Sequence, residues 1–180
     1  QNMTSGSNAV AIGRDAMNTG VYTAGDAVAI GRATLQNLTA GNYNVAVGAL
    51  VGQALTTGGG NVGIGGLALN AATTGNNNTA VGWQASRYMT TASGTTAIGY
   101  LAGGGLGGVT VMTGDNNTLV GTTAGLKTTS GDNIVAVGYS ALTQNTTGQR
   151  NSVLGAYALF SNTTGSNNVA NGFQSSYYNT

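Results

Sequence analysis

A short, fixed spacing between glycines constrains this 180-residue chain more than any other feature of its sequence. Ten glycines each end a short and mostly apolar segment, and seven of the nine intervals between them are 17 residues long, the other two being 18 and 22. These glycines are Gly13, Gly31, Gly48, Gly65, Gly82, Gly99, Gly121, Gly138, Gly155 and Gly172. A period this short predicts stacked coils, each too small to fold alone.

Aligning the repeats on these glycines shows alternating columns in one predicted strand per coil. The residue before the glycine is aliphatic in nine repeats: Ile12, Ile30, Val47, Ile64, Val81, Ile98, Val120, Val137 and Leu154. The residue two positions earlier is Val, Thr or Ser and shares its face, because side chains alternate along a strand. We expect this face to form the structural core. The residue between them, mostly alanine, is expected to face outward and to let another copy of the chain approach closely.

Turn residues divide each repeat into short extended pieces. Thr-Thr-Gly recurs at residues 56–58, 73–75, 146–148 and 163–165, and no segment between turns reaches the roughly 10 to 12 residues of an ordinary helix. Asparagines recur before the strand and could hydrogen-bond up a column: Asn44, Asn61, Asn78, Asn117, Asn151 and Asn168. The sequence predicts an all-β parallel β-roll or solenoid of ten coils, a single array over residues 1–180 and a rod on the order of 50 Å long.

Composition excludes several classes of function. Only 5% of the residues are charged, the net charge is +1, and the chain has no His and no Cys. A cationic surface for nucleic acid is therefore not expected, and no apolar run approaches the roughly 20 residues of a membrane span. General acid and base chemistry lacks its usual groups, so we expect no enzyme, no catalytic residue and no cofactor.

Two of the four aspartates, Asp115 and Asp132, stand six residues before their glycines and should lie on adjacent coils. A Ca²⁺ ion could bridge the stacked carboxylates with carbonyl oxygens. The alternative is that both are exposed turn residues separated by solvent, with Lys127 or Arg150 nearby.

The 22-residue interval contains a glycine-rich stretch, at about residues 103–112, that is five residues longer than the array needs. We expect this excess to leave the roll as a loop. Leu106 and Met112 are candidate receptor-binding residues there. A tolerated insertion or a contact with a neighbouring subunit explains the loop equally well.

Four aromatic residues directly follow the glycines: Trp83, Tyr100, Tyr139 and Phe173. We predict a broken aromatic column at one corner, in which Trp83 and Tyr100 are candidates for binding the apolar faces of sugars. Shielding of the corner between subunits is the favoured alternative.

The residues also resemble two kinds of known fibre. Residues 7–13 (SNAVAIG) resemble the strand motif of trimeric autotransporter adhesin (YadA-like) heads, and residues 75–85 (GNNNTAVGWQA) resemble repeats of phage tail fibres. The resemblance covers essentially the whole chain. It implies left-handed parallel β-rolls packed as a homotrimer outside the cell, and the 17-residue unit favours the tail fibre over adhesin heads, whose repeat is usually shorter.

These observations predict a structural and adhesive segment of a homotrimeric extracellular fibre, most consistent with a phage tail fibre in host attachment. Its partners would be copies of itself and a cell-surface glycan or protein receptor. A bacterial surface adhesin of the autotransporter type is the main alternative, and an ice-binding solenoid is a third. Because the chain begins at Gln1, we expect it to be a piece of a longer protein.

Overall fold

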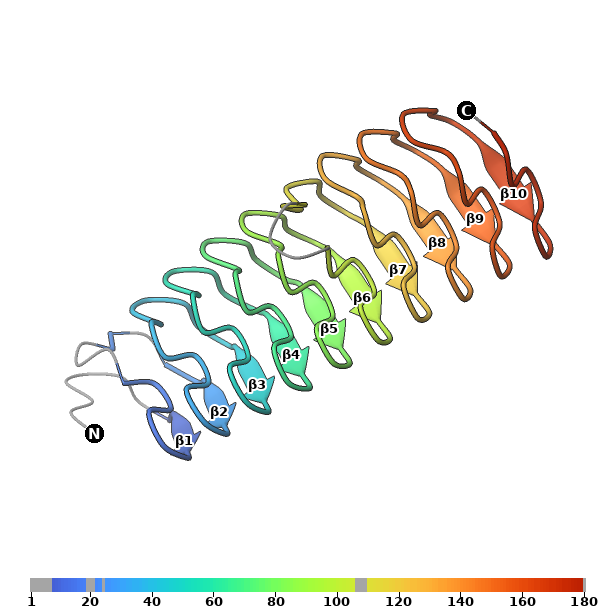
Figure 1. The fold of residues 1–180 in the computed structure, drawn as a ribbon. Coiled ribbons are helices and arrows are strands. Elements are labelled where there is room, and N and C mark those ends of the chain that lie inside the picture. Colours follow the sequence, from blue (N-terminus) through green and yellow to red (C-terminus); the bar gives the residue numbers. More distant parts are fainter. Residues whose placement is uncertain (1–7, 19–21, 24, 106–109, 180) are drawn as a thin grey trace.

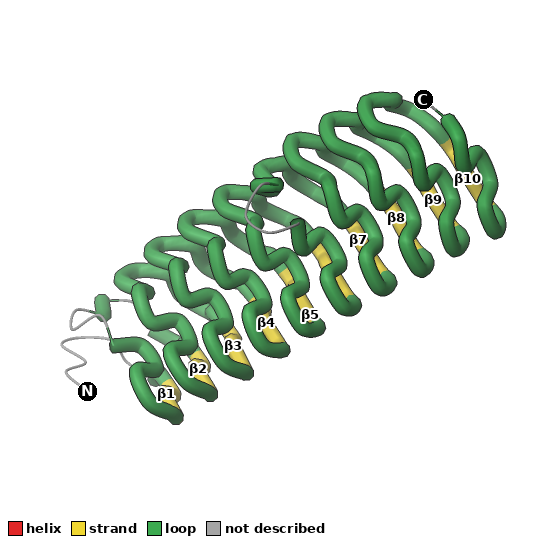
Figure 2. Tube along the Cα trace, viewed as in Figure 1, coloured by secondary structure: helices red, strands yellow, loops and turns green. Residues whose placement is uncertain are grey.

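The protein is a stack of coils with one short strand in each. The structure, a computed structural model, describes residues 8–18, 22–23, 25–105 and 110–179. Each strand has three residues: β1 (Val10–Ile12), β2 (Val28–Ile30), β3 (Val45–Val47), β4 (Val62–Ile64), β5 (Thr79–Val81), β6 (Thr96–Ile98), β7 (Thr118–Val120), β8 (Val135–Val137), β9 (Ser152–Leu154) and β10 (Val169–Asn171). Turns and loops make up the rest of the described chain (Figure 2).

All ten strands form one parallel sheet in sequence order, from β1 to β10. Equivalent positions pair across neighbouring strands, so that Ala80 lies beside Ala97 and Val81 beside Ile98. The coils therefore stack into a rod with β1 and β10 at opposite ends (Figure 1). The predicted parallel β-solenoid is confirmed. No helix in the described residues is long and apolar enough to cross a membrane.

The repeated glycines are needed where each strand ends. Gly82 has a φ of 131°, a conformation that side chains rarely adopt, and a Cβ at this position would lie 2.6 Å from the carbonyl oxygen of Gly99 on the next coil. Neighbouring backbones are therefore in direct contact at this corner. Only glycine meets both requirements, which explains the constancy of this position.

The core lies on the opposite face of the strand from the one predicted. The middle residue of each strand points inward: Ala29, Ala46, Ala80, Ala97, Leu119, Ala136, Val153 and Ala170 are all at most 3% exposed. The predicted core column is exposed or partly exposed within the chain, and this holds for Ile12, Ile30, Val47, Ile64, Val81, Ile98, Val120, Val137 and Leu154. The alanines are therefore not available to contact another copy.

The inward-facing strand residues can be small because larger side chains from other parts of the coil pack against them. A Cβ at Gly63, in the middle of β4, would lie 2.5 Å from Cγ1 of Val51 and 3.5 Å from Cδ1 of Leu69. The sizes are reversed at β7, where Leu119 fills the space left by Gly103 and Gly125. Strand alternation identifies the residues that share a face, but this complementarity of size decides which face is buried.

A ladder of buried asparagines continues the inner face ahead of the strand. Oδ1 of Asn44 accepts bonds from the backbone N and Nδ2 of Asn61, at 2.9 and 3.1 Å, and Asn61 accepts the same pair from Asn78. Nδ2 of Asn61 also donates to the carbonyl oxygen of Gly75 on the next coil. The predicted ladder is confirmed over these three coils and again between Asn151 and Asn168.

Candidate functional site

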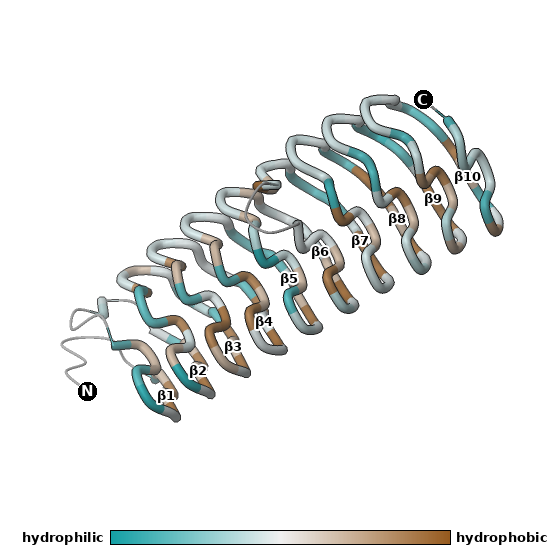
Figure 3. Tube along the Cα trace, viewed as in Figure 1, coloured by the Kyte–Doolittle hydropathy of each residue, from teal (hydrophilic) through white to brown (hydrophobic). Residues whose placement is uncertain are grey.

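The outer face of the sheet is a mostly apolar surface that no part of the described chain covers, and its polar members are Thr79, Thr96, Thr118, Ser152 and Asn171. We call it the ribbon, defined as the first and third residues of β1 to β10. Ile12 is 58% exposed and Leu154 is 53% exposed, although both were predicted to be core. Figure 3 shows apolar residues recurring along the strands from one end of the rod to the other. Ten strands about 4.8 Å apart give the ribbon a length of roughly 45 Å.

The predicted column of aromatic residues after the glycines lies beside the ribbon. In the middle of the rod, its rings do not contact one another. Trp83 and Tyr100 are both about half exposed. The ring of Trp83 lies over Gly66 of the preceding coil, where a Cβ would be 2.5 Å from the ring. Among the described residues, no ring contact joins Trp83 to Tyr100, so they form two separate exposed rings on neighbouring coils.

A larger aromatic cluster occupies the last three coils. Tyr157 lies 5.1 Å from Tyr139 and 6.3 Å from Phe173, measured between ring centroids. Phe160 and Tyr177 stack at 5.0 Å with an angle of 12° between their planes. Side-chain hydrogen bonding with Tyr139 raises the pKa of Tyr157 above its ordinary value, with a further contribution from desolvation.

Sequence reasoning found only Tyr139 and Phe173 of this cluster. It missed Tyr157, Phe160 and Tyr177, which occupy other positions of the repeat, two and five residues after the glycine. Their spacing of 17 between Phe160 and Tyr177 was a usable signal, because equal positions on consecutive coils are adjacent in the rod.

Asp115 and Asp132 lie on adjacent coils, as predicted, and both belong to a hydrogen-bonded column. Oδ1 of Asp115 accepts the backbone N–H of Ser93 at 2.7 Å, and Oδ1 of Asp132 accepts that of Asp115 at 2.8 Å. Asn76 and Ser166 use their side-chain oxygens in the same way. The carboxylates thus substitute for neutral acceptors in this column. No group of three potential acidic, His or Cys metal ligands occurs in the described residues.

The glycine-rich insertion begins later than predicted, and one of its two candidate residues is buried. Gly103 and Gly105 still hydrogen-bond to the next coil, through Ala124 and Leu126. Met112 is 1% exposed and pairs with Met89 in the core, so its prediction as a receptor-binding residue is wrong. Its apolar side chain closes the coil after the insertion. Leu106 lies outside the described residues.

The threonine corner uses its hydroxyl groups within the fold. The hydroxyl group of Thr56 donates to the carbonyl oxygen of Thr73 at 3.1 Å, and the hydroxyl group of Thr73 donates to the carbonyl oxygen of Thr90 at 3.2 Å. Thr129 and Thr146 repeat the arrangement toward the C-terminus. An ordered array of free hydroxyl groups for ice is therefore not formed by this column, and a thermal-hysteresis measurement tests the ice-binding alternative directly.

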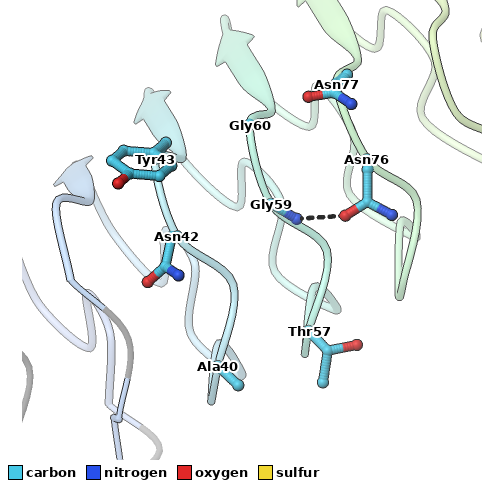
Figure 4. A pocket seen from close by; sticks show the side chains of 8 residues that line it. All are labelled: Ala40, Asn42, Tyr43, Thr57, Gly59, Gly60, Asn76 and Asn77. Carbon is cyan, nitrogen blue, oxygen red and sulfur yellow. Dashed lines mark hydrogen bonds between the residues drawn. The ribbon is translucent and has the colours of Figure 1, made fainter.

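A polar groove crosses three coils. It lies on the side of the rod where the chain turns just before it enters the strands. It has a volume of about 510 Å³. Figure 4 shows its lining residues, which come from the turns before β3, β4 and β5: Ala40, Asn42, Tyr43, Thr57, Gly59, Gly60, Asn76 and Asn77. Tyr43 stands at the rim with 67% of its surface exposed. Sequence reasoning did not identify this groove.

Comparison of the chain with known protein families, characterised proteins and solved structures found no significant match.

Proposed function

We propose that this chain is a rigid segment of a homotrimeric extracellular fibre, of the kind that phage tails use to attach to a host, and that the ribbon joins the copies. The ribbon is the observation that carries this proposal. It replaces the alanine column as the expected contact between chains, because those alanines are buried inside the coils.

The size and chemistry of the ribbon support self-association. Ile30, Ile64 and Ile98 are exposed on one face at regular intervals, in the middle of a chain with only 5% charged residues. Large, mostly apolar exposed surfaces of this kind mark interaction sites in soluble proteins. A second copy offers a surface of the same length and the same coil spacing, so that apolar side chains meet level by level.

Parallel packing of the copies around an axis along the rod would cover every ribbon at once. Such closed cyclic symmetry is the common solution for identical chains. The resemblance to trimeric fibre repeats supports three copies. The stacked coils would provide stiffness and reach, and identical surfaces on three sides would allow multivalent contact with a cell.

Light scattering combined with size-exclusion chromatography tests the assembly. Three chains of 17.6 kDa give a particle of about 53 kDa (3 × 17.6). Introducing two charges into the ribbon, as Ile64→Asp together with Ile98→Asp, should shift the mass to that of one chain, because each carboxylate would have to be buried unpaired at the interface.

The matched control places the same two charges at the exposed turn, as Thr147→Asp together with Thr164→Asp. This variant should keep the mass of the unmodified protein. A monomeric unmodified protein, or a ribbon variant that retains the trimer mass, would contradict the proposal. The sequences that flank this segment separate the two kinds of fibre, since a virion-attachment domain indicates a phage and a membrane anchor indicates a bacterial adhesin.

A further inference from the structure

We propose that the polar groove across the coils of β3, β4 and β5 binds a short, uncharged saccharide. This inference goes beyond the proposed function, because one chain supplies every lining residue and the binding does not depend on trimer formation.

The groove exists because the middle coil lacks two side chains that its neighbours carry. Asn42 and Tyr43 precede β3, Asn76 and Asn77 precede β5, and the equivalent residues before β4 are Gly59 and Gly60. The backbone itself is regular, since φ is 59° at Tyr43, 69° at Gly60 and 56° at Asn77. The groove is thus a gap in two columns of side chains on an otherwise unchanged scaffold.

Several polar groups around this gap have no partner within the described part of the chain. Oδ1 of Asn42 accepts the backbone N–H of Gly25, which leaves its amide N–H groups free. The Tyr43 hydroxyl, the Thr57 hydroxyl and the Asn77 amide have no hydrogen bond there. Asn76 is different, because its Oδ1 accepts the backbone N–H of Gly59 (Figure 4) and its Nδ2 donates to the carbonyl oxygen of Thr74. The free groups include both donors and acceptors, which suits a ligand with several hydroxyls.

The charge distribution argues for a neutral ligand. None of the eight lining residues is charged, and Asp26, the carboxylate in the column of Tyr43, lies one coil beyond the groove and accepts a hydrogen bond from Asn8. A phosphate, a carboxylate or a metal ion would lose hydration without gaining an opposite charge. A polyhydroxylated neutral molecule needs only the amide and hydroxyl groups that are present.

The remaining features match a sugar of one to three rings. The exposed ring of Tyr43 offers an apolar face beside the polar groups, a combination that suits the C–H face of a pyranose. The distance from the coil of β3 to the coil of β5 is two strand spacings, or about 10 Å, which is the length of roughly two linked pyranose rings. The open shape predicts weak binding, with a Kd on the order of 1 mM.

Saturation-transfer NMR with the purified chain tests the proposal. The probes are glucose, galactose, mannose and N-acetylglucosamine, with maltose, cellobiose and lactose as disaccharides and glucuronic acid as an anionic comparison. At least one neutral sugar should receive saturation from the protein. Gly60→Asn should weaken its binding by roughly tenfold or more, because the new side chain fills the gap.

A close control is available in the same column. A Cβ at Gly60 would lie 2.5 Å from Oδ1 of Asn77, and a Cβ at Gly94 would lie 2.5 Å from Oδ1 of Asn116, with φ values of 69° and 68°. Gly94→Asn therefore makes the same change outside the groove and should leave binding unaltered. Both substitutions introduce asparagine at the repeat position that Asn77 and Asn116 occupy on the neighbouring coils. Both proteins should therefore fold.

Tyr43→Asn supplies a second test, since it removes the ring and keeps a residue that tolerates the local backbone. It should weaken binding about fivefold. The proposal is overturned if no neutral sugar binds, if glucuronic acid alone binds, or if Gly60→Asn binds as tightly as Gly94→Asn. Light scattering on the same samples shows whether a loss of binding accompanies any change in assembly.

Discussion

The two faces of the ten-stranded sheet obey different constraints, although they alternate within the same three-residue strands. On the inner face, the size of each residue is matched to its neighbours, as Gly63 is to Val51 and Leu69. On the outer face, mostly Val, Ile and Thr succeed one another, and no described part of the chain packs over them. The comparison teaches that packing inside the coil constrains the inner residues closely, while the outer residues are free of such constraints within one chain.

Breaking the size match on the inner face should give the largest effect. Leu119→Ala should lower the free energy of unfolding by about 3 to 5 kcal/mol, because it leaves a cavity beside two glycines that carry no side chain. Urea denaturation at a fixed chain concentration measures the change.

A compensating substitution distinguishes the loss of volume from other causes. A Cβ at Gly125 would lie 2.7 Å from Cδ2 of Leu119, so Gly125→Leu alone should also destabilise the protein. Combined with Leu119→Ala, it recreates the pairing of Ala136 with Leu142 on the next coil and should recover a large part of the loss. Purely additive effects of the two changes would contradict this account of the core.

Breaking the polar part of the inner face should have a smaller effect. Asn61→Ala should cost about 2 kcal/mol, because it leaves the backbone N–H of Asn78 and the carbonyl oxygen of Gly75 without their buried partners. Urea denaturation again provides the measurement. The exposed Thr74→Ala on the following turn is the control and should lie within about 0.5 kcal/mol of the unmodified protein.

The smallest effect is expected on the outer face. Val62→Thr gives β4 the residue found at the same place in β5, β6 and β7, where Thr79, Thr96 and Thr118 stand. Because threonine already stands at this place in three neighbouring strands, the free energy of unfolding should change by less than about 1 kcal/mol, whether or not the ribbon is covered by another copy. A loss as large as that from Asn61→Ala would show that the outer face is as tightly constrained as the inner one.

The repeat period was sufficient to predict the coils, the parallel strands and their register, because equal spacing brings equal positions together. The required glycines and the asparagine ladder follow from the same alignment. The buried face could not be chosen this way, since alternation is symmetric and valine looks more like a core residue than alanine does. The residues that show which face is buried are at β7. There the middle residue of the strand, Leu119, is large, and the residues it packs against, Gly103 and Gly125, are small.

The surface sites were harder to predict because they depend on which side chains are missing. The groove forms because Gly59 and Gly60 lie between two coils that carry side chains at the same positions. In the sequence alone, these glycines are explained by the turn in which they stand. Met112 illustrates a related difficulty. The length of the 22-residue interval shows that extra residues are present, but the position at which the chain returns to the core depends on contacts with Met89.

Backbone hydrogen bonds between consecutive coils mostly join residues 16 to 18 positions apart, and side-chain bonds such as that between Asn61 and Asn44 join residues 17 apart. Deleting or duplicating one such unit would preserve the pattern of backbone hydrogen bonds and change the rod by about 4.8 Å, provided that the inner side chains at the new junction match in size. Recombination between neighbouring repeats can therefore adjust the reach of the molecule in small, equal increments. Rods of different length can thus arise from the same repeat, within the limits that side-chain size sets at each junction.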